Sequence, residues 1–132
     1  MIKPMSPPVE QTSKLLRICL VLTGLTGALG VVSLALSAHS AAPALLSTAA
    51  QMLLFHAPVF LGIGVLAQIR QVPLLPFVAA LLGIGLFLFC GDLFSRILIG
   101  QRLFPMSAPI GGMLVIVSWV GLALSALRVK PK

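Results

Sequence analysis

Two oppositely charged residues, Asp92 and Arg96, stand at the end of a long apolar segment. A carboxylate within a membrane-spanning segment is costly and is usually paired with another group. The four-residue spacing places both side chains on one face of a helix, where they can form an ion pair. One interpretation is therefore a structural pair that tethers the helix end at the membrane surface. The alternative is that Asp92 is a functional carboxylate, which binds a proton or a substrate.

His56 is the second candidate, because it lies about ten residues inside another apolar segment, roughly 15 Å deep at 1.5 Å per residue. This depth is close to the midplane of a hydrocarbon core about 30 Å thick. A polar group buried there needs a partner. The expected partner is a hydroxyl at the same level, from Thr26 or Ser118, or the backbone carbonyl that Pro58 leaves without its helical donor. His56 is then either structural, or part of a proton relay or a ligand contact.

Few residues are present for other chemistry. His39 and His56 differ in predicted depth by roughly 15 Å, which is too far for one haem to bridge them within a subunit. Two histidines and Asp92 are too few for a convincing metal site. Cys19 and Cys90 are predicted near opposite membrane faces, beyond the Cα separation of about 7 Å that a disulfide allows. The sequence has no nucleophile elbow, phosphate loop, paired carboxylates or metalloprotease motif, so we expect no enzyme, no cofactor and no metal.

The composition places this chain in a membrane. Of its 132 residues, 59% are apolar and 8% are charged, whereas a soluble domain carries about 25% charged residues. A mean hydropathy of +1.16 agrees with lipid as the main solvent. The net charge of +7 does not indicate nucleic acid binding, because the Lys and Arg residues form no basic stripe or aromatic patch and lie at the ends of apolar segments.

Four apolar segments predict an all-α membrane protein, with four transmembrane helices in an up-down-up-down bundle. The first segment is interpreted as a retained helix, since it is too long for the apolar region of a signal peptide. The loop between the third and fourth spans should lie in the membrane interface. The four spans are predicted at about 15–37, 46–67, 73–94 and 108–127, and together they form one domain at 14–128. A disordered cytoplasmic tail at 1–13 precedes this domain, and a basic tail at 129–132 follows it.

Small residues and prolines predict local features of these helices. Gly24 and Ala28 form a small-xxx-small pair, which suits close helix packing. Pro58 should kink the second span. Ser107 is the expected N-cap of the fourth span, and Pro109 is a first-turn proline.

Two glycines and a tryptophan mark the fourth span. Gly111 and Gly112 leave bare backbone N–H groups near the helix start, which could hold an anion. Close packing against a neighbouring helix is the favoured interpretation of this pair. Trp119 lies deep in the span rather than in an interfacial belt. It is predicted to be a packing residue, or an anchor that faces lipid or a partner.

The distribution of cations predicts the orientation. With four spans, both termini and the 68–72 loop share one side, which holds seven of the nine Lys and Arg residues: Lys3, Lys14, Arg17, Arg70, Arg128, Lys130 and Lys132. The other side holds Arg96 and Arg102. Because cytoplasmic loops carry the excess of positive charge, we expect both termini in the cytoplasm and the chain in a bacterial inner membrane.

Several motifs together resemble one family. They are FHAP in the second span, LFCGDLF at the end of the third, SAPIGG at the start of the fourth, and Trp119. Over about residues 20–130 the chain is similar to small membrane proteins of unknown function typified by bacterial YgdD and by transmembrane protein 256 (domain of unknown function 423). It departs from that pattern at Asp92, where serine is usual, and just before His56, where an acidic residue and a Tyr-Gln pair are common. The resemblance implies the fold and topology and brings no established activity.

The favoured function is a structural or accessory subunit that packs in the lipid bilayer against a larger membrane partner or against itself. The small residues, the short loops and the lack of an active-site motif indicate this role. The alternative is a small transporter or channel-like protein in which His56 and Asp92 line a polar path. A water-filled crevice that reaches His56 would favour the transporter, and a dry, closed bundle with a lipid-facing partner groove would favour the subunit.

Overall fold

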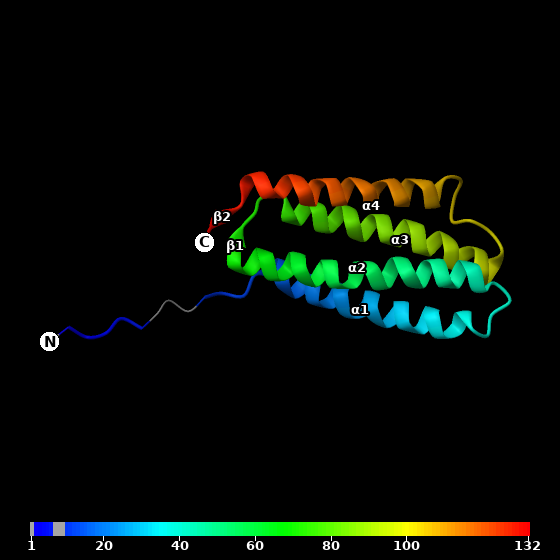
Figure 1. Ribbon diagram of the computed structural model, residues 1–132, viewed down its shortest axis with the longest axis horizontal. Coiled ribbons are helices and arrows are strands. Elements are labelled where there is room, and N and C mark those ends of the chain that lie inside the picture. Colours follow the sequence, from blue (N-terminus) through cyan, green and yellow to red (C-terminus); the bar gives the residue numbers. More distant parts are fainter. Residues whose placement is uncertain (1, 7–9) are drawn as a thin grey trace.

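The apolar segments fold into four long helices, because backbone N–H and C=O groups in lipid must be satisfied within the chain. The structure is a computed structural model that describes residues 2–6 and 10–132. The helices are α1 at Lys14–Ser37, α2 at Pro43–Ile69, α3 at Leu75–Ile99 and α4 at Ser107–Leu124, which continues as a 3-10 turn, η1, at Ser125–Arg128. Each is long and apolar enough to cross a membrane, and consecutive helices run antiparallel (Figure 1). The predicted four-helix bundle is confirmed.

The helix ends differ from prediction where proline and glycine set them. α2 begins at Pro43, three residues before its predicted start, because a first-turn proline fits a helix start. It continues through Pro58 without a break. α3 extends five residues past its predicted end, to Ile99, and stops at Gly100, whose φ of 70° is the left-handed conformation that commonly ends helices. Arg96 is therefore part of a helix and not of the loop.

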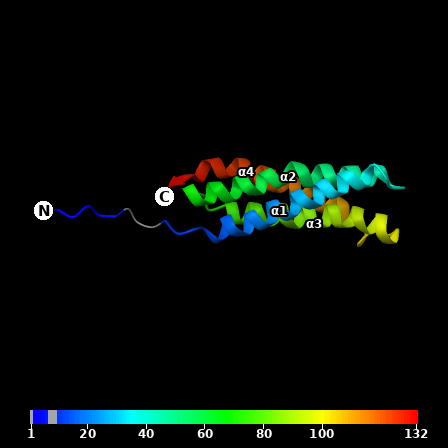
Figure 2. The same ribbon diagram turned by 90° about the horizontal axis from the view of Figure 1, so that it is seen from below.

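The bundle consists of two antiparallel hairpins that meet through α2 and α3. α1 packs along α2, α3 packs along α4, and α2 and α3 form the seam between the hairpins. The buried apolar core follows this seam, with Phe60 and Ile63 from α2 and with Leu75 and Leu82 from α3. Figure 2 shows α1 and α3 overlapping near the termini and separating towards the other end. The seam thus fixes the two hairpins, while α1 and α3 are free to diverge.

Glycines set the closest approaches between neighbouring helices. A Cβ atom at Gly111 of α4 would lie 2.6 Å from the backbone nitrogen of Phe89 and 2.7 Å from the carbonyl oxygen of Gly85, both in α3. A Cβ atom at Gly64 of α2 would lie 2.8 Å from the Cβ atom of Cys19 in α1. No side chain fits at these distances unless the helices move apart, so both contacts require glycine.

The small-residue pair singled out on α1 points out of the bundle. Gly24 and Ala28 are exposed, and a Cβ atom at Gly24 would meet no atom within 4 Å. α1 instead approaches α2 at Gly30, where a Cβ atom would lie 2.8 Å from the side chain of Leu54. The pair Gly24 and Ala28 therefore makes no close packing within this chain. Spacing alone could not indicate which glycines face inward, because α1 is apolar on all sides.

The chain segments at the two termini are tied to the turn between α2 and α3. β1, Arg70–Gln71, pairs antiparallel with β2, Lys130–Pro131. The basic tail predicted at 129–132 therefore contains a short strand. Gln68 adds further ties: its Oε1 accepts from the backbone N–H of Ser13 at 2.7 Å, and its carbonyl accepts from Nζ of Lys132 at 2.9 Å. Both termini lie at one end of the molecule (Figure 1).

The tail predicted at 1–13 is described in part. Residues 2–6 and 10–13 form no helix or strand, and residues 1 and 7–9 lie outside the described residues. Ser13 is the N-cap of α1, and its hydroxyl oxygen accepts from the backbone N–H of Leu15 at 3.2 Å. Serine commonly satisfies the first N–H groups of a helix in this way.

Replacement of Gly111 by alanine should destabilise the contact between α3 and α4. The new methyl group would approach backbone atoms of α3 to 2.6 Å, so the helices must separate. We expect the free energy of unfolding, measured by titration with a denaturing detergent, to fall by about 1–3 kcal/mol, the usual cost of overpacking. Gly112→Ala is the matched control, because its methyl group would lie 3.8 Å from the ring of Phe89. Equal effects of the two substitutions would contradict the close approach.

Candidate functional site

The carboxylate of Asp92 lies fully buried near the end of α3, and three parts of the chain supply its partners. Its side chain is 0% exposed. The hydroxyl of Ser107 donates to Oδ1 at 2.6 Å, and the backbone N–H of Leu103 donates to the same oxygen at 3.2 Å. Nη2 of Arg96 lies 2.7 Å from Oδ2. The carboxylate therefore joins α3, the connecting loop and the first residue of α4.

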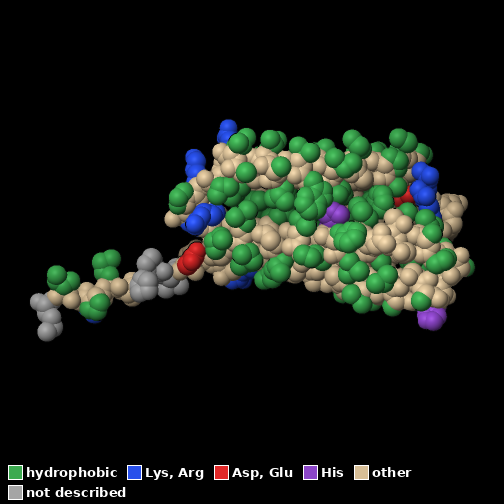
Figure 3. Space-filling model, viewed as in Figure 1, with side chains coloured by type: hydrophobic (Ala, Val, Ile, Leu, Met, Phe, Trp, Pro, Cys, Tyr) green, Lys and Arg blue, Asp and Glu red, His purple; other side chains and the backbone are tan. Residues whose placement is uncertain are grey.

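Arg96 completes the ion pair that the sequence spacing predicts. Its side chain is 27% exposed, so the guanidinium reaches from the surface to the buried carboxylate. The contact between Oδ2 of Asp92 and the guanidinium is an ion pair without a well-aligned hydrogen bond. Nε of Arg96 is buried and has no hydrogen-bond partner among the described residues. Figure 3 shows an acidic side chain beneath cationic atoms at the end of the molecule away from the termini. The pair therefore lies at the end of the bundle away from the end where α1 begins.

The loop between α3 and α4 is shaped by this carboxylate. Met106 has a φ of 71°, a conformation that costs a residue with a side chain about 1–2 kcal/mol. Hydrogen bonds within the loop offset that cost. Leu103 and Ser107 donate to Asp92, and the hydroxyl of Ser95 donates to the carbonyl of Gln101 at 2.6 Å. The prediction that Ser107 N-caps α4 is wrong, since Ser107 is the first residue inside the helix. Its hydroxyl donates to the carboxylate, and hydrogen bonds to a charged oxygen are roughly twice as strong as neutral ones.

His56 of α2 bonds across the bundle to Trp119 of α4. The indole Nε1 donates to Nε2 of the imidazole at 3.1 Å, and the two rings meet edge to face with their centroids 5.8 Å apart. Nδ1 lies 2.5 Å from the carbonyl oxygen of Met52, one helical turn earlier. Because the indole nitrogen can only donate, Nε2 must accept, and Nδ1 carries the proton that is shared with Met52. The geometry therefore assigns the ring proton to Nδ1.

The partners predicted for His56 are wrong, because other groups occupy both ring nitrogens. A hydroxyl at the same depth or the carbonyl freed by Pro58 was expected, but Ser118 donates its hydroxyl to Val115 in its own helix at 2.7 Å. Serine in helices often bonds to its own backbone in this way. Trp119, at 45% exposed, packs on the imidazole and also reaches the outer surface. Its N–H was a usable signal, since an indole in lipid needs an acceptor.

Two apolar cavities open on the side of the bundle where α1 and α3 diverge. The first, of about 330 Å³, lies between α1, α2 and α3, and the second, of about 590 Å³, lies beyond it at the end away from the termini. Neither cavity is lined by His56 or by Asp92, so neither connects those residues to water. His39 lines the second cavity, in the exposed turn after α1. The three candidate polar residues are therefore not brought together.

The remaining candidate residues lie at the start of α4. Pro109 is in the first turn, Gly111 packs directly on α3, and Gly112 lies at ordinary contact distance from the ring of Phe89. Close packing thus occurs at one of the two glycines. Both cysteines are free and buried. Within residues 2–6 and 10–132 there is no group of three or more His, Cys, Asp or Glu side chains that could hold a metal ion.

Fold and sites together define a small multi-pass membrane protein whose buried polar side chains bind one another. The family described as "Protein of unknown function (DUF423)" matches residues 26–112, which is more than half of the chain. The chain therefore belongs to this family, and the resemblance seen in its motifs is confirmed. The match runs from the second half of α1 to the first turns of α4 and includes His56, Asp92 and Arg96. No solved structure matches the chain.

The Asp92–Arg96 pair should show energetic coupling in a double-mutant cycle. Asp92→Asn and Arg96→Gln each leave one charge without its partner, which costs about 3–5 kcal/mol for a fully buried pair and less here, because Arg96 is 27% exposed. Each single variant should unfold at a lower temperature in detergent. The double variant should lose less than the sum, with a coupling of about 0.5–3 kcal/mol.

The control for this cycle is Arg102→Gln, which removes the exposed cation in the neighbouring loop. Combined with Asp92→Asn, it should give additive losses. Strict additivity between Asp92→Asn and Arg96→Gln would show that the two charges do not interact.

Proposed function

We propose that this protein is a non-catalytic accessory subunit of the bacterial inner membrane, which packs against a larger membrane partner or against a second copy. The observation that carries the proposal is that both polar sites within the spans are closed by groups of the same chain. Asp92 has partners from α3, the loop and α4, and His56 has partners from α2 and α4. These residues hold helices together and are not open to a substrate.

Closed polar sites favour packing over transport. A carboxylate or an imidazole on a transport path must exchange protons or ligands with water. Asp92 is 0% exposed and His56 is 5% exposed, and the two apolar cavities do not include them. The alternative, a small transporter or channel-like protein with a polar path through both residues, has no support in this geometry. Three buried hydroxyls also donate to carbonyls of their own helical segments: Ser33, Ser118 and Ser125.

The outward face of α1 is the surface that we assign to the partner. Gly24 and Ala28 are exposed one turn apart, so another helix can approach α1 closely there. Close packing matters in lipid, because the hydrophobic effect does not drive helices together in that solvent. This face is not used within the chain, where Gly30 and Gly64 make the close contacts of α1 with α2.

Native mass spectrometry from a mild detergent tests this assignment. The wild-type protein should be recovered in an assembly heavier than one chain. The double variant Gly24→Leu/Ala28→Leu should be recovered mainly as a single chain, because two bulky side chains block the approach of another helix. Gly62→Leu is the matched control, since Gly62 is also exposed with no atom within 4 Å of its Cβ position. It should leave the assembly intact.

Two results would overturn the subunit proposal. One is a wild-type protein that leaves the membrane as a single chain under every mild extraction condition. The other is proton or solute flux in reconstituted vesicles that the wild-type protein supports and His56→Ala abolishes. The second result would establish the transporter instead.

We also propose that both termini face the cytoplasm. The paired strands β1 and β2 bring the α2–α3 turn and the C-terminal residues to the end where α1 begins. Seven Lys and Arg residues belong to these segments, whereas Arg96 and Arg102 belong to the opposite end. An excess of cations of this kind is typical of the cytoplasmic side.

Single cysteines at Gln71 and Gln101 test the orientation in intact cells, in a chain with Cys19 and Cys90 replaced by alanine. Both positions are exposed and lie at opposite ends of α3. A membrane-impermeant maleimide should spare the cysteine at position 71 and modify the one at position 101. Both should react after permeabilisation. The reverse pattern in intact cells would invert the orientation, and equal labelling would contradict four spans.

A further inference from the structure

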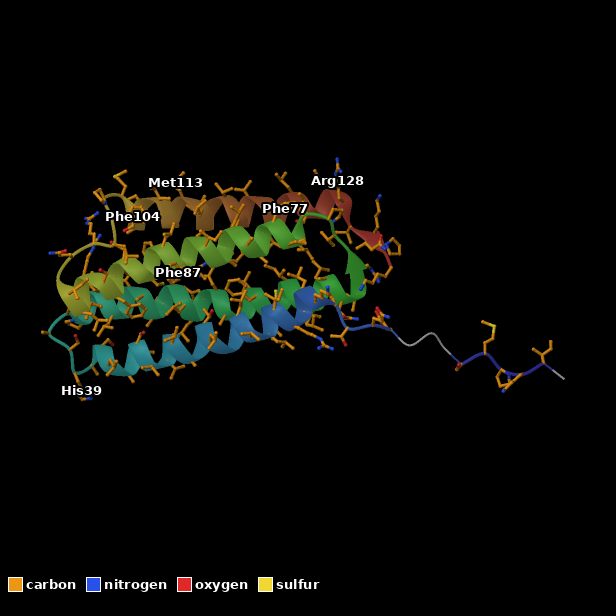
Figure 4. The ribbon with its side chains drawn as sticks, turned by 180° about the vertical axis from the view of Figure 1, so that it is seen from behind. His39, Phe77, Phe87, Phe104, Met113 and Arg128 are labelled. Carbon is orange, nitrogen blue, oxygen red and sulfur yellow. The ribbon has the colours of Figure 1, made fainter. Side chains whose placement is uncertain are left out.

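One long apolar groove runs between α1 and α3. The two cavities described above, of about 330 and 590 Å³, adjoin at Leu29 and Phe94 and follow one another along α1 and α3. We call this space the α1–α3 groove. Its floor is α2, which contributes Leu53 and Phe60, and Figure 4 shows Phe87 on the α3 wall. Leucine and phenylalanine side chains make most of its lining.

The groove occupies the half of the bundle away from the termini. Along α1 it extends from Leu22 to Leu36, which is about 21 Å at 1.5 Å per residue. Along α3 it extends over a similar length, from Gly83 to Leu98. In the other half, Cys19 and neighbouring core residues close the space between the helices. The groove therefore begins near mid-membrane and opens towards one face.

Neither water nor any described part of the chain fills this groove. Water is disfavoured, because a buried water needs two to four polar partners, and the lining is almost entirely apolar. The described N-terminal residues, 2–6 and 10–13, lie at the opposite end of the molecule (Figure 1). If the groove were empty, its lining atoms would lose the van der Waals contacts that an apolar occupant provides. In a bilayer the groove needs an occupant from the membrane.

We propose that the α1–α3 groove binds one acyl chain of a phospholipid from the leaflet away from the termini. One leaflet with its headgroup region is about 20–22 Å thick, and its hydrocarbon part is about 15 Å thick. The groove is about 21 Å long, so it can hold an acyl chain together with the start of the headgroup at its mouth. The chain enters from the membrane face and ends at the closed inner end near Phe60 and Gly83. This proposal is independent of the accessory role, because it concerns the groove and not the outward face at Gly24 and Ala28.

The end of the groove suits a lipid headgroup. His39 and Ser40 line it there, in the turn after α1. Figure 4 shows His39 at the end of the molecule opposite to Arg128. The Ser40 hydroxyl and the His39 ring can donate hydrogen bonds to a phosphate, whereas the charge of Arg96 is already paired with Asp92. An apolar groove with a polar mouth at the membrane face is the arrangement that one lipid molecule requires.

A partner helix fits this groove less well than an acyl chain. A transmembrane helix crosses the whole hydrocarbon core of about 30 Å. It would meet the closed half of the bundle, where core residues such as Cys19 and Leu75 join the helices. A lipid of one leaflet, about 20–22 Å long with its headgroup, ends where the groove ends.

Photolabelling in vesicles of phosphatidylethanolamine and phosphatidylglycerol tests the proposal. Two probes are used, each a phosphatidylglycerol with a diazirine on one acyl chain, placed near the carboxyl end or near the methyl end. After irradiation, peptide mass spectrometry should place the first label near Leu36 and Ile97, and the second near Phe60 and Gly83. The reversed order would contradict the assigned leaflet.

Two pairs of variants show whether the labelled lipid lies in the groove. Leu29→Trp fills the junction of the two cavities, and Leu20→Trp is its control on the same helix, at a similarly exposed leucine outside the groove. Gly83→Leu fills the inner end and Gly62→Leu is its control, because both Cβ positions have no atom within 4 Å. Each groove variant should reduce labelling of these peptides by about tenfold, which corresponds to about 1.4 kcal/mol of weakened binding. The controls should label like the wild type.

Three results would overturn the proposal. The first is labelling that the groove variants and their controls lower equally. The second is labelling spread evenly over all lipid-facing helices. The third is a wild-type dimer or hetero-complex, cross-linked at Leu29 or Phe94, that Leu29→Trp dissociates; the occupant would then be a protein helix.

Discussion

The buried carboxylate of Asp92 imposes the strictest demand on this structure. A charge without exposure in an apolar bundle must be satisfied within the chain. Its partners bring the loop and the first residue of α4 against the end of α3, and they hold Met106 in a left-handed conformation. With the start of α4 fixed there, Gly111 can pack on the backbone of α3. One carboxylate thus sets the register of the α3–α4 hairpin.

The hydrogen bond between His56 and Trp119 connects the two hairpins. The α1–α3 groove lies between two helices that have no such bond. His56 and Trp119 link α2 to α4, and the hydroxyl of Thr23 donates to the carbonyl of Ala57 and so links α1 to α2. In the part of the chain that the structure describes, no side-chain hydrogen bond joins α1 to α3. In Figure 2 these helices overlap near the termini and diverge beyond them. Helix pairs that share a side-chain hydrogen bond are therefore held together, and α1 and α3, which lack one, leave a groove open to lipid.

The range of each interaction explains what the sequence could predict. The four helices follow from the length of the apolar segments, and the Asp92–Arg96 pair follows from spacing within one helix. The hydrogen bonds that Ser107 and Trp119 donate were missed, because they depend on how separate helices are rotated against each other. Helices that are apolar on every side carry no periodic signal for that rotation. For the same reason the sequence singled out Gly24 for close packing, although that residue faces outward.

The central claim is that the polar sites within the spans are closed to water, and the nitrogen NMR spectrum of His56 in bilayers tests it most directly. The exposed His39 provides the internal reference for an imidazole in contact with water. We predict a His56 ring with its proton on Nδ1, a hydrogen bond from the indole of Trp119 to Nε2, and no magnetisation transfer from water, whereas His39 should receive it. Magnetisation transfer from water to His56 as strong as that to His39, with loss of the indole bond, would reveal a path to water and contradict the account.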